Sequence, residues 1–187
     1  MLFRFLPKSL ISITTTILVV GMAGCNTQSG KMTYSVKTVS DGDTIAVTDS
    51  SNKEIKVRFA CVDAPEVPHT TNERKSRKLV DKNQFEWGAK AQQRLRELVK
   101  QGGDRVLLTI TDTDRYGRKI SEVRLPDGTF VQEVLLKEGL VQVYRPYLKD
   151  CPSAAIVTQA EAMAKHKSVG VWSDSKYIPA WEWRHGN

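Results

Sequence analysis

Apolar and polar residues alternate along residues 34–61, and two groups of turn-forming residues interrupt this alternation. The first interruption is Asp41–Asp43 and the second is the polar stretch Asp49–Lys53. A period of two is typical of a β-strand that buries one of its faces. The segment therefore predicts three strands in an antiparallel meander, with the third strand continuing through Phe59 to Cys61.

The rest of the chain predicts two more strands and three helices. Alternation indicates strands near Val106–Ile110 and Ile120–Leu125. Apolar residues at helical spacing indicate helices at about residues 86–100, 131–138 and 153–167, each with glycine near its end. The 187 residues are about one domain's length. These elements predict an α+β fold, a five-stranded OB-type β-barrel with about three helices.

The first 25 residues have the three-part layout of an export signal. Arg4 and Lys8 precede the apolar stretch Leu10–Val20, which is short and threonine-rich for a membrane span of about 20 residues. Met22–Cys25 resembles a bacterial lipobox, in which the cysteine receives the lipid. We expect a lipoprotein signal at 1–24, a tether at 25–32, a domain at 33–174 and a packed tail at 175–187.

This layout predicts an exported protein that is anchored to the membrane at the cell envelope through a lipid on Cys25. A plain secreted signal and an uncleaved anchor helix are the alternatives. Export also bears on Cys61 and Cys151, because an even cysteine pair can form a disulfide in an oxidising compartment. We favour that disulfide over two buried free thiols.

The composition narrows the classes of protein and of partner. Twelve Gly and seven Pro exclude a collagen-like or proline-rich low-complexity chain, and three Cys are too few for a disulfide scaffold. The formal net charge of +7 favours a polyanionic partner such as nucleic acid or an anionic membrane surface.

Three short motifs combine carboxylates with arginines at turns and strand ends. They are Asp41-Gly42-Asp43-Thr44, Arg58 followed by Val62-Asp63-Ala64-Pro65-Glu66, and Asp114-Arg115-Tyr116-Gly117-Arg118. Carboxylate oxygens suit a hard cation such as Ca²⁺, and arginines suit a phosphate. A cation, a phosphate clamp and one spare carboxylate are the groups that phosphodiester hydrolysis requires.

Together, in this order, the motifs resemble those of the staphylococcal (micrococcal) nuclease family, also called thermonucleases, across roughly residues 33–174. The resemblance implies that one Ca²⁺ is held by the carboxylates of Asp43 and Asp63 and by the main-chain oxygen of Ala64. The eponymous nuclease has Thr at the position of Ala64, a difference that a main-chain ligand tolerates. Asp41 would support the site without touching the ion.

The same resemblance implies the catalytic residues and the substrates. Glu66 would be the general base toward the attacking water, and Arg58 and Arg118 would hold the scissile phosphate. The family cleaves DNA and RNA endonucleolytically and leaves 3′-phosphate ends. Arg115, Tyr144 and Tyr147 are candidate substrate contacts, although the tyrosines also suit ordinary half-buried positions. We expect a monomer.

Residues 67–86 form a longer loop than the eponymous nuclease has at this place. The loop is rich in basic side chains, namely Arg74, Lys75, Arg77, Lys78 and Lys82. Such a loop can follow a phosphate backbone beside the site. It can equally be a solvated insertion with no fixed partner.

Two other classes compete with a nuclease. A non-catalytic OB-fold nucleic-acid-binding lipoprotein would keep the barrel, and a structural calcium site would use the same carboxylates. Neither class needs Glu66, Arg58 and Arg118 together with both metal-binding aspartates. The complete set therefore favours an enzyme.

Overall fold

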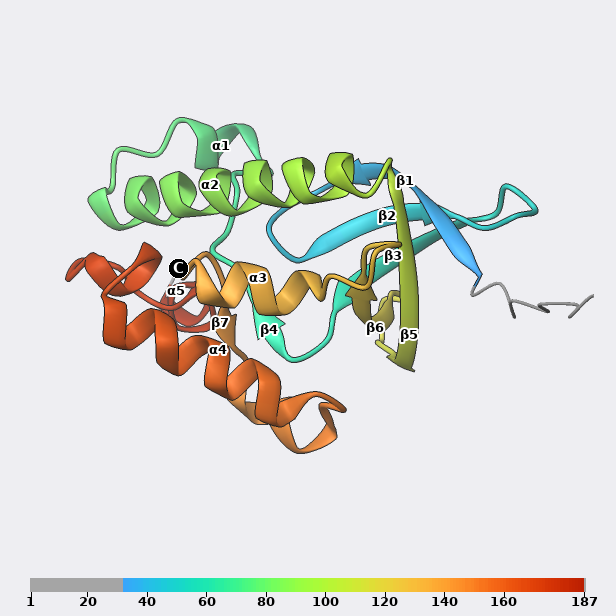
Figure 1. Ribbon diagram of the computed structural model, residues 1–187. Coiled ribbons are helices and arrows are strands. Elements are labelled where there is room, and N and C mark those ends of the chain that lie inside the picture. The colour runs from blue at the N-terminus through green and yellow to red at the C-terminus, as the bar shows by residue number, and fades with distance from the viewer. Residues whose placement is uncertain (1–31, 187) are drawn as a thin grey trace, which may run out of the picture. The chain divides into compact units, whose positions relative to one another are not determined.

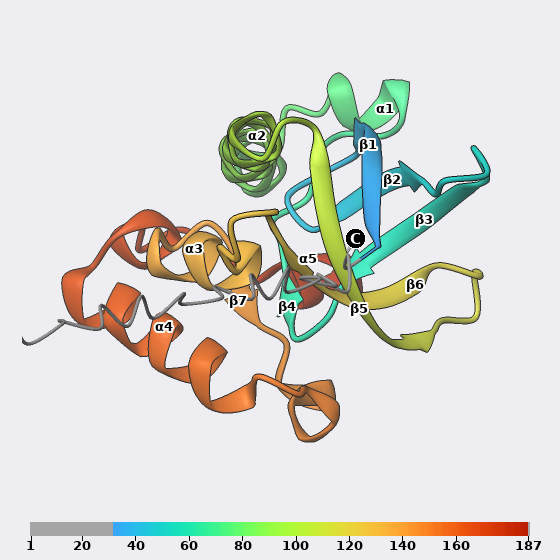
Figure 2. The same ribbon diagram turned by 45° about the vertical axis from the view of Figure 1, so that its right-hand side comes forward.

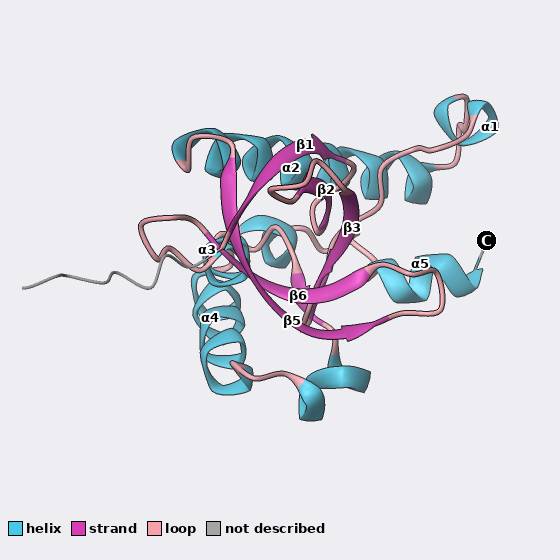
Figure 3. Ribbon diagram, turned by 90° about the vertical axis from the view of Figure 1, so that its right-hand side faces the viewer, coloured by secondary structure: helices cyan, strands magenta, loops and turns pink. Residues whose placement is uncertain are grey.

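The computed structural model describes residues 32–186, and its strands form a closed five-stranded barrel (Figure 3). Around the barrel the order is β1-β2-β3-β6-β5. The strands are β1 (Thr33–Val39), β2 (Thr44–Thr48), β3 (Glu54–Phe59), β5 (Arg105–Thr113) and β6 (Lys119–Arg124). Only the β3–β6 pairing within this barrel is parallel. The predicted five-stranded α+β barrel is confirmed.

The described residues contain more helices than the three that the sequence predicts. The helices are α1 (Thr71–Arg74), α2 (Leu79–Gln101), α3 (Val131–Lys137), α4 (Ala154–Lys167) and α5 (Ala180–Gly186), with 3₁₀ segments η1 (Arg145–Asp150) and η2 (Gly170–Ser173). In Figures 1 and 2, α3 lies between α2 and α4.

One hydrophobic core joins the barrel to α2, α3 and α4. Val57, Phe59 and Val123 from the strands are at most 2% exposed, and Leu95 of α2 and Leu135 of α3 are fully buried in the same cluster. The alternation in β3 and the helical spacing in α2 and α3 both direct their apolar residues into this core.

The predicted start of the long helix was wrong by seven residues, since α2 begins at Leu79 rather than near Glu86. Its buried face begins with Asp81, Gln84 and Gly88, and apolar residues follow only from Ala91 onward. Because two of those residues are polar and one has no side chain, the first turns lack an apolar period. The region predicted as the loop 67–86 therefore contains α1 and the first turns of α2.

The third strand was also predicted too long. β3 ends at Phe59, and Cys61 adopts a left-handed backbone conformation with φ of 73°. The chain then forms the two-residue strand β4 (Val62–Asp63), which pairs with β7 (Gln142–Val143) outside the barrel. Alternation continues through Cys61, so the sequence pattern alone does not reveal this exit.

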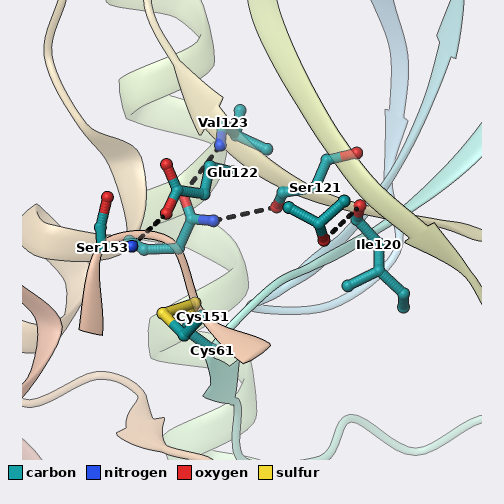
Figure 4. The surroundings of a disulfide bond; sticks show 9 residues. Cys61, Ile120, Ser121, Glu122, Val123, Cys151 and Ser153 are labelled. Atoms are coloured by element: carbon teal, nitrogen blue, oxygen red, sulfur yellow. Dashed lines mark hydrogen bonds between the residues drawn. A yellow bond between two sulfur atoms is a disulfide. The ribbon is translucent and has the colours of Figure 1, made fainter. Parts of the chain in front are cut away.

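A disulfide between Cys61 and Cys151 connects the exit from the barrel to the chain just before α4 (Figure 4). It is the pair that the sequence analysis favours, and its Cα atoms are 5.5 Å apart. The buried carboxylate of Glu122 lies beside it and accepts a hydrogen bond from the Ser153 N–H at 2.8 Å. The disulfide therefore fixes the position of the chain directly before Val62 and Asp63.

Within residues 32–186, no helix combines the length and the apolar character that crossing a membrane would require. The predicted signal at 1–24, Cys25 and nearly all of the tether lie outside the described residues.

Candidate active site

Asp43 lies in the turn between β1 and β2, where backbone contacts fix its position. Its N–H donates to Asp41 Oδ1 at 2.9 Å, and its main-chain oxygen accepts the Phe59 N–H at 2.8 Å. A Cβ atom on Gly42 would lie 2.6 Å from the Cβ of Ala91 in α2. Glycine at this position therefore lets the turn approach the helix closely.

Asp43 and Asp63 lie close together in the interior, and one guanidinium bridges them. The two aspartates are 3% and 1% exposed. Arg58 of β3 forms ion pairs with both, with its Nη2 atom 2.5 Å from Asp63 Oδ1. Asp43 Oδ2 also accepts the Ala64 N–H at 2.6 Å. The structure thus brings together the carboxylates predicted to bind a metal ion, Ala64 and one of the predicted phosphate-binding arginines.

These groups fit a hard cation. Asp43 and Asp63 both face the Arg58 guanidinium, and their oxygens are of the kind that Ca²⁺ prefers. In the part of the chain from 32 to 186, Cys61, Glu122 and Cys151 are the one closely spaced group of three metal-ligating side chains, and their sulfurs form the disulfide. Asp43 and Asp63 therefore need the main-chain oxygen of Ala64 and water to complete a coordination shell.

Glu66 follows the buried pair and is less enclosed, with its side chain 19% exposed. Its carboxylate forms an ion pair with Arg184 of α5, and the same guanidinium donates to Asp63 Oδ2 at 2.8 Å. Sequence reasoning missed Arg184. The predicted packing of the tail at 175–187 was the one signal available, and it did not indicate which side chain reaches the site.

Arg118 lies apart from this group, on the turn between β5 and β6. Its Nε donates to Asp114 Oδ2 at 2.7 Å, and its N–H donates to Asp114 Oδ1 at 2.9 Å. Lys119, the next residue, pairs with Val57 of β3, so Arg118 directly precedes the strand that neighbours Arg58. No described contact joins Arg118 to Asp43, to Asp63 or to Glu66.

Of the other candidate substrate contacts, Arg115 and Tyr147 are exposed and Tyr144 is half-buried. Arg115 donates to the hydroxyl of Tyr116 at 2.7 Å, and Tyr116 is 69% exposed. Tyr144 precedes η1, and its ring stacks on Tyr147 with the centroids 5.6 Å apart. The rings of Tyr144 and of Trp181 in α5 are 6.2 Å apart, so one of these tyrosines also packs against the C-terminal helix.

Burial and charge shift the pKa of several groups in this region. Burial raises the pKa of Asp41, and the nearby positive charge of Arg58 only partly opposes it. Burial and the charge of Asp63 both raise the pKa of Tyr177, which stays a neutral phenol. Burial opposes the charge of Arg184, but Asp63 and Glu66 outweigh it and raise its pKa. Arg184 is therefore a cation at any working pH.

Residues 67–86 are folded against their own backbone and against α5. A capping box between Thr70 and Glu73 starts α1, and Arg74 donates to the main-chain oxygen of His69 at 3.0 Å. Asp81 is 6% exposed and accepts hydrogen bonds from Ser76 and from the Trp183 indole. The segment is therefore more structured than the loop predicted from the sequence.

Comparison with known proteins identifies the class to which this fold and site belong. The family of staphylococcal nuclease homologues matches residues 56–174. The chain therefore belongs to the staphylococcal nuclease family, as its motifs indicate. That match includes Arg58, Asp63, Ala64, Glu66 and Arg118, whereas Asp43 and Arg184 lie outside it.

Individual relatives agree with this family. The chain is 33% identical over 147 residues to an uncharacterized endonuclease of Escherichia coli O157:H7, covering 79% of this chain and 81% of the relative. It is 32% identical over 181 residues to an uncharacterized endonuclease of Haemophilus influenzae, covering 97% and 85%. It is 31% identical over 155 residues to a micrococcal nuclease of Shigella flexneri, covering 79% and 77%.

Proposed function

We propose that this protein is a calcium-dependent endonuclease that hydrolyses phosphodiester bonds of DNA and RNA and leaves 3′-phosphate ends. The observation that carries the proposal is the buried pair Asp43 and Asp63, bridged by Arg58, with Glu66 beside it. Membership of the staphylococcal nuclease family and the endonuclease names of the relatives support a hydrolytic nuclease.

Each group has a distinct part in the proposed reaction. Asp43, Asp63 and the main-chain oxygen of Ala64 would hold the cation, which would polarise a phosphoryl oxygen. Glu66 would take a proton from the attacking water while the water oxygen bonds to phosphorus. The bond from phosphorus to the 5′-oxygen would then break, the departing 5′-oxygen would take up a proton from solvent, and the phosphate would stay on the 3′ side. Arg118 would neutralise the charge that develops on the phosphate.

Arg58 would have two roles in this proposal, one toward the aspartates and one toward the phosphate. Its guanidinium interacts with both Asp43 and Asp63. A cation held by those carboxylates would satisfy their charge instead and would leave the guanidinium available to a phosphate. Arginine suits this exchange because its planar fork binds carboxylate and phosphate in the same bidentate way.

The experiment is a cleavage assay on single-stranded DNA and on RNA with Ca²⁺, with Mg²⁺ and with a calcium chelator. We expect cleavage with Ca²⁺, its loss with the chelator, and products that polymerase extends only after a phosphatase has removed the 3′-phosphate. Arg118→Ala should abolish most of the activity. Nucleic-acid binding without cleavage would instead support the binding-module alternative.

We also propose that the protein is exported and anchored to the cell envelope through a lipid on Cys25. The basic start, the apolar stretch and the lipobox-like Met22–Cys25 support this, and a disulfide between Cys61 and Cys151 suits an oxidising compartment. Intact-mass analysis of membrane-extracted protein should find acylation at Cys25. An unmodified, fully soluble product would contradict the anchor.

The proposed oligomeric state is a monomer. The described barrel and helices share one continuous core. Light scattering on the purified protein should give the mass of one chain, and a dimer mass independent of concentration would contradict this expectation.

A further inference from the structure

The C-terminal helix α5 delivers a positive charge to the acidic groups of the candidate active site. Arg184 forms ion pairs with Asp63 and with Glu66, and these partners are 121 and 118 positions away in sequence. Asp63 is 1% exposed, whereas the Arg184 side chain is 39% exposed. The guanidinium therefore reaches inward from the surface and bridges two carboxylates to which the proposed function assigns different tasks.

Two tryptophans that precede Arg184 in α5 hold this helix in place. The indole of Trp183 donates to Asp81 Oδ1 at 3.0 Å, and its ring packs edge-on against Phe85 with the centroids 5.6 Å apart. Trp181 packs near the ring of Tyr144. An aromatic residue with one polar contact is well suited to fixing an element in this way.

The chain that leads to α5 is attached to α2, the helix that also carries Asp81 and Phe85. Asp174 accepts hydrogen bonds from the Asn83 amide at 2.6 Å and from the Trp87 indole at 2.9 Å, and both donors belong to α2. The C-terminal segment is thus fixed at Asp174 and again at Trp183. This attachment leaves little freedom for Arg184 to move away from its two carboxylates.

The carboxylate of Glu66 depends on this contact for its orientation. Arg184 donates to Oε1, while Oε2 is 3.9 Å from the ring nitrogen Nε2 of His69, beyond hydrogen-bond reach. One oxygen of Glu66 is therefore fixed, and the other is available to accept a proton. A general base needs this arrangement, because its oxygen must be held in place and still be accessible to water.

We infer that Arg184 is a positioning residue of this site, which fixes Glu66 and Asp63 relative to each other through one guanidinium. The inference rests on the proposed nuclease function. It makes α5 a working part of the site, although this helix lies beyond residues 56–174 where the family matches. A lysine could not replace the arginine fully, because a single ammonium lacks the planar fork that spans two carboxylates.

The test compares the wild type with Arg184→Gln, Arg184→Lys and the control Arg105→Gln in the chain that lacks residues 1–24. Arg105 starts β5 and donates to the Thr33 hydroxyl at 3.5 Å, so its removal takes away one arginine outside the site. Kinetics on single-stranded DNA give kcat and KM, calorimetry gives the affinity for Ca²⁺, and thermal melting reports folding.

We expect Arg184→Gln to lower kcat about 10- to 100-fold, because a misplacement near 1 Å is enough for such a loss. KM should change less than about threefold, since the residue is not assigned to substrate binding. Arg184→Gln should bind Ca²⁺ at least as tightly as the wild type, because the substitution removes a positive charge next to the ion. Arg184→Lys should recover part of kcat, and Arg105→Gln should match the wild type.

Four results would overturn the inference. An unchanged kcat in Arg184→Gln would show that Glu66 does not need this contact. A higher kcat together with tighter Ca²⁺ binding would show that Arg184 blocks the site rather than ordering it. If Arg184→Gln unfolds, Arg184→Lys decides in its place, and a wild-type kcat there would count against positioning. If the wild type does not cleave, the proposed function fails and takes this inference with it.

Discussion

The two arginines that the motifs assign to phosphate have different surroundings. Arg58 lies between two buried aspartates, and its side chain is 17% exposed. Arg118 is on a turn, its side chain is 30% exposed, and its carboxylate partner is Asp114, four residues earlier. The ion-pair partners of Arg58 come from two parts of the chain, the turn before β2 and the strand β4, whereas that of Arg118 comes from its own turn.

This difference separates a fixed part of the site from an adjustable one. Asp43 receives the Ala64 N–H, and Asp63 receives two arginines, so neither carboxylate can rotate without losing buried contacts. Unmaking buried polar contacts costs about 1–3 kcal/mol each, so this part is rigid. Arg118 can exchange its half-buried partner Asp114 for a phosphate at a lower cost, because a partly exposed pair between residues four apart contributes only about 0–1 kcal/mol.

The largest expected effect is at the rigid part. Asp63→Asn keeps the size of the side chain but removes the charge that faces two guanidinium groups. We expect the loss of Ca²⁺ binding, measured by calorimetry, and a fall in kcat of at least about 10³-fold, because a metal ion supplies several kcal/mol of transition-state stabilisation.

Asp112→Asn is the matched control, because this aspartate is exposed on β5 and accepts only its neighbour Thr113 N–H among the described bonds. It should bind Ca²⁺ and cleave as the wild type does. Calcium binding that persists in Asp63→Asn would remove this carboxylate from the proposed ligand set. The rigid part of the site would then not be the part that binds the ion.

The adjustable side gives the next effect. Arg118→Ala should lower kcat about 10²- to 10³-fold, the usual cost of losing one donor to a developing negative charge. Ca²⁺ affinity should stay at the wild-type value, because no described contact joins Arg118 to Asp43 or Asp63. Steady-state kinetics and calorimetry on the same preparation check both parts, and a parallel loss of Ca²⁺ binding would show that the two regions are not separate.

The contrast between local and long-range contacts also explains what the sequence could predict. Alternation and turn residues are local signals, and they were sufficient to predict the five-stranded barrel. Asp43 directly precedes β2, Arg58 lies near the end of β3, and Asp63 ends β4, just after the chain has left the barrel. The three motif residues come together because the ends of these neighbouring strands meet. Their convergence therefore follows from topology, whereas their individual motifs are only turn signals.

Arg184 could not be found in this way. Its partners are more than a hundred residues away, and nothing in the sequence around Trp183 distinguishes it from an exposed arginine in a tail. The early start of α2 was missed for a related reason. Asp81 is buried because Trp183 donates to it, so its helical position depends on a contact that the sequence does not display.

Gly88 shows how closely α2 approaches the rigid part. A Cβ atom there would lie 1.9 Å from the main-chain oxygen of Glu66, so Gly88→Ala must push the helix and Glu66 apart. We expect a stability loss of about 1–3 kcal/mol, the usual cost of overpacking. The displaced Glu66 should also lower kcat, by up to about 10²-fold. Denaturant unfolding and kinetics measure the two effects.

Gly186→Ala is the control, because a Cβ atom there meets nothing within 4 Å. It should unfold and cleave as the wild type does. Wild-type kcat in a folded Gly88→Ala protein would mean that Glu66 tolerates displacement. The rigid part of the site would then include Asp63 but not Glu66.

The smallest effect tests the adjustable side by pH. Burial opposes ionisation of Asp114, but the hydrogen bonds from Arg118 and from the Tyr116 N–H outweigh it and lower its pKa. A lowered pKa in the folded state means that the carboxylate stabilises the fold above its ordinary pKa and loses this contribution as the pH falls through the lowered value. Asp114→Asn should therefore melt a few degrees below the wild type at pH 7, about 1–4 °C for a pair worth up to about 1 kcal/mol.

At pH values below the lowered pKa of Asp114, the melting temperatures of the two proteins should converge, because the wild-type carboxyl is then also neutral. A difference that persists unchanged in acid would show that the turn is held by the backbone hydrogen bonds to Asp114 rather than by its charge. In that case Arg118 would already be released from electrostatic restraint at neutral pH, and the turn would be even more adjustable than its ion pair indicates.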